Sequence, residues 1–129
     1  MNTFTVKTSA RSEMLDITSN VRDVVAKAGI EQGACLVYCP HTTAGITINE
    51  NADPAVVRDL LTILDTMVPW QNGYAHTEGN SAAHAKSSLV GCSAWVIIDH
   101  GDLVLGTWQS IFFCEFDGPR TRKVHVRVI

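Results

Sequence analysis

This chain of 129 residues has few charged residues and no long apolar run. Only 18% of its residues are Asp, Glu, Lys or Arg, whereas soluble domains have about 25%. No window reaches the roughly 18 apolar residues of a membrane span, and no positively charged segment leads into an apolar stretch near the start. We therefore expect a cytoplasmic protein with no membrane partner. The low charge predicts that an oligomer covers part of the surface.

The four cysteines lack the spacing of a disulfide framework or a metal knuckle. Cys35, Cys39 and Cys114 lie within apolar runs, and no CxxC occurs, so reduced thiols are expected. The net charge is −3 and most basic residues are scattered, so no basic face for nucleic acid is predicted. The P-loop, the dinucleotide fingerprint and a Ser-His-Asp order are also missing, which leaves the familiar kinds of nucleotide hydrolysis without support.

The first half of the chain contains segments with clear periodicity. The length favours a single domain over residues 1–129, large enough to bury about two-thirds of the unfolded chain's surface. Alternation predicts a strand over 3–7, and apolar runs predict strands over 33–40 and 44–49. Helical spacing from residue 21 predicts a helix with Thr18 or Ser19 as N-cap and Gly29 at its end. Asp53 and Pro54 predict the start of a second helix, which Pro69 stops.

The second half predicts a long loop, a short helix and further strands. Residues 69–81 are polar and contain Gly and Asn, as in many functional loops. Ser81 is expected to cap a short helix that ends at Gly91. From residue 94 the chain is typical of strands separated by turns. The helices do not alternate regularly with the strands, and the strands are expected to form mainly antiparallel or mixed β-sheet layers. We therefore predict a compact α+β domain with two to three helices.

Three of the five histidines lie where they could share a ligand. His125 alternates with valines in a strand and His100 precedes a glycine in a turn, so both are expected at the surface. His41, His76 and His84 lie at the ends of predicted elements. Three imidazoles can bind a zinc-like ion and leave one position open. Neither HExxH nor a Cys/His knuckle is present, so spacing alone leaves a shared metal site and separate surface positions as alternatives.

Other polar side chains could serve such a site. Asn49 and Glu50 follow an apolar strand and need partners if they are buried, so they could orient imidazoles or supply a general base. The start of the short helix offers unpaired N–H groups to an anion, with Lys86 and Ser87 close in sequence. Arg120 is a further candidate for an anion, although residues 117–120 are better explained from the sequence alone as a turn followed by a basic strand.

Near Thr107 the sequence offers one more candidate group. Trp108 is expected in the core, as a tryptophan in a strand usually is. The neighbouring Gln109 must then either face solvent or be hydrogen-bonded.

Three motifs give the chain a resemblance to a known family. They are HTTAGITINENADP over 41–54, HTEGNSAAHAKSSLVG over 76–91 and LGTWQSIFFCEFDGPR over 105–120. In this order they resemble the YjbQ-like family, whose members are called secondary thiamine-phosphate synthases. The likeness covers nearly the whole chain. It implies an α+β fold that assembles as a homotrimer, with a pocket that contains His41, His76 and His84.

The resemblance also implies a reaction. A hydroxymethylpyrimidine diphosphate loses pyrophosphate, and the nitrogen of a thiazole phosphate captures its methylene carbon. Such a step needs charge stabilisation on the leaving diphosphate more than a strong base. A divalent metal is implied, and imidazole ligands favour a zinc-like ion over magnesium. The expected residues are His41, His76 and His84 for metal, Glu50, His41 and His84 for catalysis, Lys86, Ser87 and Arg120 for phosphate, and Asn49, Thr107 and Gln109 for orienting the ligands.

Two other functions remain open at this point. The same histidines could hold a metal whose bound water hydrolyses a small phosphorylated metabolite. Alternatively, the protein could be a trimer that binds a metal or an anion and performs no chemistry.

Overall fold

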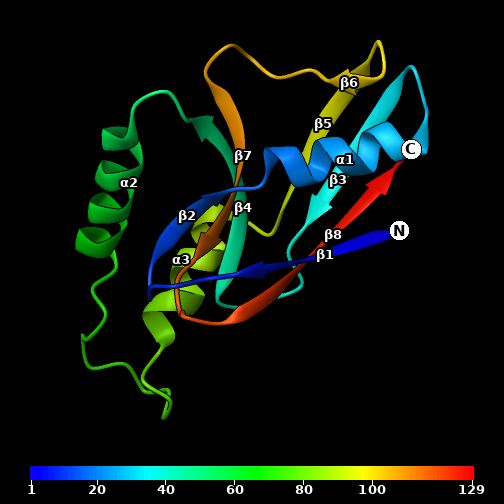
Figure 1. The fold of residues 1–129 in the computed structure, drawn as a ribbon. Helices are drawn as coiled ribbons and strands as arrows, with labels where there is room; N and C mark the ends of the chain where they lie inside the picture. Colours follow the sequence, from blue (N-terminus) through cyan, green and yellow to red (C-terminus); the bar gives the residue numbers. More distant parts are fainter.

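Eight strands and three helices make up the computed structural model, which describes residues 1–129 (Figure 1). The strands are β1 (Asn2–Lys7), β2 (Glu13–Asp16), β3 (Gly33–Tyr38), β4 (Ala44–Glu50), β5 (Ser93–Asp99), β6 (Asp102–Leu103), β7 (Gln109–Glu115) and β8 (Thr121–Val128). The helices are α1 (Thr18–Ala28), α2 (Pro54–Met67) and α3 (Ser81–Val90). The predicted α+β class with up to three helices is confirmed.

The strands form two antiparallel sheets. One has five strands in the order β1-β8-β3-β5-β6, and the other has three in the order β2-β7-β4. Alternate side chains of both sheets, together with one side of α1, build the main apolar core. Val21 and Val25 of α1 meet Val37 of β3, Val126 of β8 and Phe113 of β7 there. The five-stranded sheet therefore has one face in the core, while its other face has no helix over it (Figure 1).

The uncovered face of the five-stranded sheet carries large apolar side chains. Trp95 is 57% exposed and Ile97 is 64% exposed, both on β5. Leu36 pairs with Trp95 across the β3–β5 ladder, and Tyr38 lies two residues further along β3. Contiguous exposed apolar surface of this kind is typical of an interaction site.

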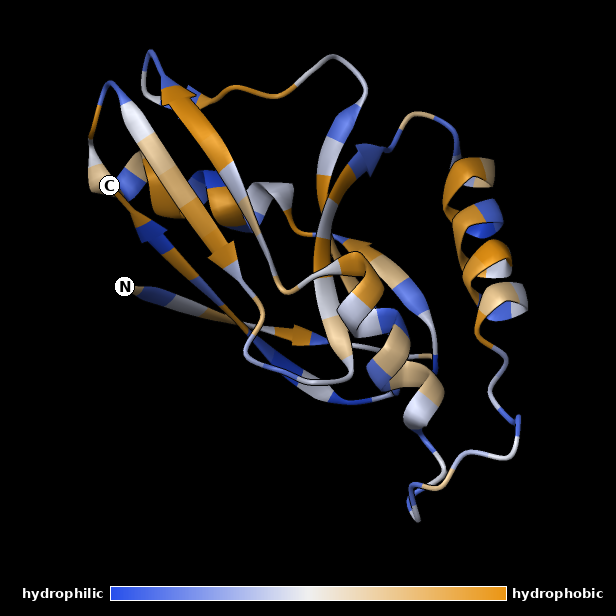
Figure 2. Ribbon diagram, turned by 180° about the vertical axis from the view of Figure 1, so that it is seen from behind, coloured by the Kyte–Doolittle hydropathy of each residue, from blue (hydrophilic) through white to orange (hydrophobic).

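Helix α2 stands beside the three-stranded sheet and buries none of its residues completely (Figure 2). Its start is as predicted, because Asp53 accepts a hydrogen bond from the Ala55 N–H at 2.9 Å and Pro54 occupies the first turn. Val57 and Leu64 pack against the smaller core cluster around Phe112. The apolar side of α2 is thus only partly covered within one chain, with Ile63 and Met67 exposed.

Several local predictions were wrong. The residue before α3 is Asn80 rather than Ser81, and its side chain makes no capping hydrogen bond. The residue before α1 is Ile17, while Asp16 accepts from the Thr18 N–H at 2.9 Å. Trp108 is 64% exposed instead of lying in the core, because it precedes β7 in a turn.

Strands β2 and β6 were not predicted from the sequence. Both are short, and each forms only because it pairs with a longer strand, β2 with β7 and β6 with β5. Local periodicity does not record such pairings.

The cysteines are all free, as expected. Burial raises the pKa of Cys39 to about 11 and that of Cys114 to about 12, so both remain thiols at neutral pH. Cys92 is the exposed one. None of the helices combines the length and apolar character needed to cross a membrane.

Candidate functional site

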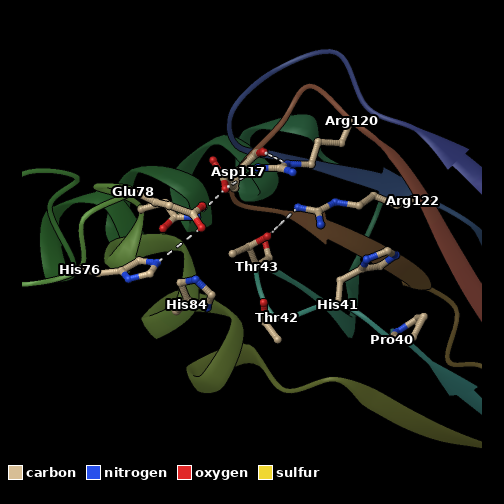
Figure 3. A pocket seen from close by; sticks show the side chains of 11 residues that line it. Pro40, His41, Thr42, Thr43, His76, Glu78, His84, Asp117, Arg120 and Arg122 are labelled. Atoms are coloured by element: carbon tan, nitrogen blue, oxygen red, sulfur yellow. Dashed lines mark hydrogen bonds and ion pairs between the residues drawn. The ribbon is translucent and has the colours of Figure 1, made fainter.

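A polar pocket of about 460 Å³ lies at the junction of the two sheets with α3 (Figure 3). Four segments that are distant in sequence contribute to it: the connection after β3, the loop before α3, the first half of α3, and the β7–β8 turn with the start of β8. Except for one proline, every side chain lining it is polar or charged. The polar pocket is lined by Pro40, His41, Thr42, Thr43, His76, Glu78, Asn80, His84, Asp117, Arg120 and Arg122.

A buried ion pair forms one wall of the polar pocket. Arg122 of β8 is 4% exposed and Glu115 of β7 is 0% exposed. The Arg122 Nε donates to Glu115 Oε1 at 2.9 Å, and Nη2 donates to Oε2 at 2.5 Å. Because β7 and β8 belong to different sheets, this bidentate pair joins the sheets at the pocket.

The remaining partners of the pair complete its hydrogen bonding. The Thr8 hydroxyl donates to Glu115 Oε1 at 2.8 Å, and two backbone N–H groups of the following turn donate to Oε2 at 3.1 Å. Burial alone would raise the pKa of Glu115, but Arg122, the Thr8 hydroxyl and the Asp117 N–H together hold this pKa below its usual value. Glu115 is therefore a carboxylate at neutral pH.

Arg122 keeps one nitrogen available for a ligand. Its Nη2 also donates to the Thr43 hydroxyl at 2.8 Å, while Nη1 has no acceptor within the protein. The guanidinium lines the polar pocket, so the free N–H groups of Nη1 can serve an anion there. A fixed guanidinium with an unused donor is suited to phosphate or carboxylate.

His41 follows β3 and is held in one protonation state. The backbone N–H of Lys123 donates to His41 Nε2 at 2.9 Å. Burial, and then the nearby Arg122 charge, lower the pKa of His41, so the ring is neutral at neutral pH. A neutral ring whose Nε2 accepts a hydrogen bond carries its proton on Nδ1. As arranged, His41 can donate a hydrogen bond from Nδ1 but has no free nitrogen for a metal.

His76 and His84 lie across the polar pocket from His41 (Figure 3). Their rings meet edge to face with centroids 5.6 Å apart. His76 Nε2 is 4.0 Å from Glu78 Oε1. Two imidazoles and a carboxylate are a donor set that zinc prefers, although no three His, Cys, Asp or Glu side chains form a group that could hold a metal ion in these positions.

Arg120 reaches the polar pocket through the β7–β8 turn. Its Nη2 donates to Asp117 Oδ2 at 3.0 Å, and its Nε donates to the Asp117 carbonyl at 2.8 Å. The Asn80 Nδ2 donates to the same carboxylate oxygen at 2.9 Å. Asp117 thus ties the loop before α3 to the turn that carries Arg120.

Two of the residues expected to contact phosphate lie elsewhere. Lys86 is 2% exposed and forms an ion pair with Asp65 of α2. The Ser87 hydroxyl donates to the Ala44 carbonyl at 2.7 Å. Neither lines the polar pocket, because both side chains anchor α3 to neighbouring elements.

The predicted base and the predicted orienting residues also lie apart from the polar pocket in this chain. Glu50 pairs with Gln109 at the far end of β4, and Asn49 precedes it. β4 begins beside the pocket and runs for seven residues, which spans roughly 20 Å. Gln109 accepts a hydrogen bond from the Gly106 N–H at 2.8 Å, in the same turn as Thr107.

Sequence reasoning missed several lining residues, above all Arg122 and its partner Glu115. One signal was available: Glu115 interrupts the apolar run around Phe113, and a charge inside such a run needs a buried partner. The sequence could not predict which basic side chain pairs with Glu115, because the pairing depends on how the turn between β7 and β8 folds.

Comparison with known proteins identifies the family. The family model described as "UPF0047 protein YjbQ-like" matches residues 2–129. The chain belongs to the YjbQ/UPF0047 family. UPF0047 protein YugU of Bacillus subtilis is 55% identical over 100% of this chain and 98% of its own length. UPF0047 protein MJ1081 of Methanocaldococcus jannaschii is 50% identical over 98% of this chain and 91% of its own length.

Solved structures of YjbQ-like proteins have the same fold. The crystal structure of an uncharacterised YjbQ/UPF0047 protein from Clostridium acetobutylicum superposes with a TM-score of 0.99 at 53% identity, and covers 100% of both chains. The hypothetical protein APE1520 from Aeropyrum pernix superposes with a TM-score of 0.95 at 35% identity, over 99% of this chain and 96% of its own. The family resemblance expected from the three motifs is confirmed.

Removing the buried carboxylate tests the wall of the polar pocket. At pH 7, Glu115→Gln should lower the free energy of unfolding by about 3–5 kcal/mol, because Arg122 loses its buried counter-charge. Because the folded pKa of Glu115 lies below the unfolded value near 4.5, its contribution is present above that value and is lost as the pH falls through the folded pKa. In Glu115→Gln the free energy of unfolding should therefore fall less between neutral and acidic pH than in wild type. Urea unfolding at several pH values measures this difference.

The exposed Glu31 provides the matched control. Glu31→Gln should change the free energy of unfolding at pH 7 by less than about 0.5 kcal/mol. Equal stability of Glu115→Gln and Glu31→Gln would show that the buried pair does not hold the two sheets together.

Proposed function

We propose that this YjbQ-like protein is a transferase whose polar pocket holds the phosphate groups of a small metabolite. The reaction is the one that the family resemblance implies, coupling of hydroxymethylpyrimidine diphosphate with thiazole phosphate and loss of pyrophosphate. The observation that carries the proposal is the buried Arg122 guanidinium with Nη1 unused, beside the neutral His41 ring.

The two groups suit an anion for different reasons. Arg122 supplies a positive charge that Glu115 and Thr43 hold in position, so no reorganisation is needed when a ligand binds. His41 supplies a neutral N–H donor, whose direction is set by the bond from Lys123. Arg120 adds a second guanidinium at the exposed rim. Together they would stabilise negative charge on a diphosphate.

The coupling step needs little acid or base chemistry. The bond between the methylene carbon and the diphosphate oxygen breaks, and pyrophosphate leaves with the electron pair. A new bond forms between that carbon and the thiazole nitrogen, which becomes positively charged and has no proton to lose. Charge stabilisation at the leaving group is then the main task of the protein. Glu50 lies far from the polar pocket, which is compatible with this reaction because no general base is required.

The proposed metal would lie on the opposite side of the polar pocket. His76 and His84, with Glu78, would hold a zinc-like divalent ion once their side chains turn toward one another, since in their present positions they do not form a metal-binding group. When bound, such an ion would neutralise negative charge on the diphosphate. His41 does not fit this role, because its Nε2 accepts the Lys123 hydrogen bond.

Hydrolysis of a small phosphorylated metabolite is the second candidate. It rests on the same group of His76, His84 and Glu78, which would hold a metal whose bound water attacks the phosphate group. A protein that only binds a metal or an anion is the third candidate, and it shares the same polar pocket.

We also propose that the chain assembles as a homotrimer, as the resemblance implies. The uncovered face of the five-stranded sheet is the surface proposed for this contact, since Trp95 and Ile97 would otherwise remain in water. The low charged fraction of the chain supports the same proposal.

The activity can be tested with both coupling substrates and the full chain. Wild type should form thiamine phosphate, measured by chromatography with fluorescence detection. His41→Ala should lower kcat/KM about 10- to 100-fold, as expected for one lost hydrogen bond to a charged group. His100→Ala, a change in an exposed turn, should leave the rate unchanged. Release of inorganic phosphate without coupling would favour the hydrolase, and no turnover with retained phosphate binding would favour the binding protein.

Metal binding can be tested separately by calorimetry with Zn²⁺. His76→Ala and His84→Ala should each weaken binding by tenfold or more, because each removes one of the few available ligands. His41→Ala should bind Zn²⁺ as wild type does. Equal loss in all three variants would show that His41 is a ligand and that its bond to Lys123 breaks on binding.

The trimer can be tested by light scattering coupled to size exclusion. Wild type should have three times the 14.0 kDa mass of one chain. Trp95→Asp and Ile97→Asp should shift the mass toward that of one chain, because each places a charge in the proposed contact. Met67→Asp, on the exposed side of α2, is the control. Dissociation by Met67→Asp alone would place the contact on α2 instead.

A further inference from the structure

A second cavity of about 550 Å³ adjoins the polar pocket and shares Thr42 and His84 with it. It lies along the second half of α3, where the chain turns into β5. We call it the neutral cavity, and it is lined by Thr42, His84, Ser87, Ser88, Gly91 and Cys92. Figure 3 shows Thr42 and His84 together at the edge of the polar pocket. A ligand that fills both cavities would pass beside these two side chains.

The neutral cavity has a different chemistry from the polar pocket. No carboxylate, ammonium or guanidinium group lines it. The Ser87 hydroxyl donates to the Ala44 carbonyl at 2.7 Å, and the Ser88 hydroxyl donates to the His84 carbonyl at 3.0 Å. Both hydroxyl protons are therefore committed within the protein, which leaves the oxygens as acceptors. The lining can receive hydrogen bonds, and beyond His84 at the boundary with the polar pocket it has no group that would neutralise a charged ligand.

The floor of the neutral cavity is held by backbone contacts. The Ile46 N–H donates to the Gly91 carbonyl at 3.0 Å, and the Cys39 N–H donates to the Cys92 carbonyl at 2.8 Å. At Gly45 a Cβ would come within 2.5 Å of the Gly91 carbonyl oxygen, so only glycine allows β4 to approach this closely. The shape of this cavity is thus largely formed before a ligand binds.

We infer that the substrate has two unlike ends: a phosphate group in the polar pocket, and an uncharged ring bearing hydrogen-bond donors in the neutral cavity. This inference rests on the proposed function, since it assumes that the polar pocket holds phosphate. It adds a specificity rule. Metabolites with a second charged group at the far end are disfavoured, because the neutral cavity leaves such a charge without a partner.

Two probes separate the cavities. Inorganic phosphate matches the polar pocket alone, whereas glucose 6-phosphate adds an uncharged ring with hydroxyl groups. By calorimetry, wild type should bind glucose 6-phosphate at least about tenfold more tightly than inorganic phosphate. Cys92→Phe should remove this difference by filling the neutral cavity, and should leave the affinity for inorganic phosphate unchanged. Cys92→Ser is the matched control and should behave as wild type.

A second readout uses the chemistry of Cys92 in the unmodified protein. Cys92 is the exposed cysteine, so N-ethylmaleimide should alkylate it and spare the three buried thiols. Glucose 6-phosphate should slow this alkylation, measured by mass spectrometry, and inorganic phosphate should not. The result does not depend on how well Cys92→Phe folds.

The outcomes distinguish this inference from the proposed function. If both probes bind equally tightly and neither protects Cys92, the neutral cavity holds no part of the substrate, while phosphate binding in the polar pocket still stands. If wild type binds neither probe, both the proposed function and this inference are overturned.

Discussion

The Glu115–Arg122 ion pair is the constraint on which the site depends. It lies where β7 of one sheet turns into β8 of the other, so it joins the two sheets at the polar pocket. Burying two charges is costly, and hydrogen bonds to the remaining polar atoms of the pair offset this cost, while Arg122 Nη1 alone is left facing the polar pocket. Here Thr8 and Thr43 supply such partners from two further segments. The pair therefore couples packing of the core to the shape of the polar pocket.

The same pair explains why the polar pocket has two chemically different sides. Glu115 is fully enclosed and holds Arg122 from behind, which leaves the guanidinium facing the pocket beside the neutral His41. The opposite side carries Glu78 and the edge-to-face histidines. A pocket with anion donors on one side and metal-preferring groups on the other is suited to a phosphate and a cation held side by side. The three histidines thus line one pocket in different environments, because His41 accepts a hydrogen bond from Lys123 while His76 and His84 meet edge to face.

Much of the fold could be predicted from local signals. The capped start of α2 at Asp53, the end of α1 at Gly29 and the alternation of β1 each follow from short-range rules of helix capping and strand periodicity. The short strand β2 and the exposure of Trp108 did not follow, because both depend on which distant segment lies alongside. The expected roles of Asn49 and Glu50 also depended on tertiary contacts that the sequence does not give, since both residues lie at the end of β4 away from the polar pocket.

By itself, the sequence determined the α+β class, the family resemblance and the choice of His41, His76 and His84 as candidates, because these depend on neighbouring residues and on short motifs; the structure places His76 within the loop before α3 and His84 inside α3 rather than at element ends. Only the tertiary structure decided that Arg122 lines the polar pocket, that Lys86 is buried against Asp65, and that His41 accepts from Lys123. The physical reason is that a side chain's protonation state and available donors depend on groups that folding brings near it, and these lie far away along the chain.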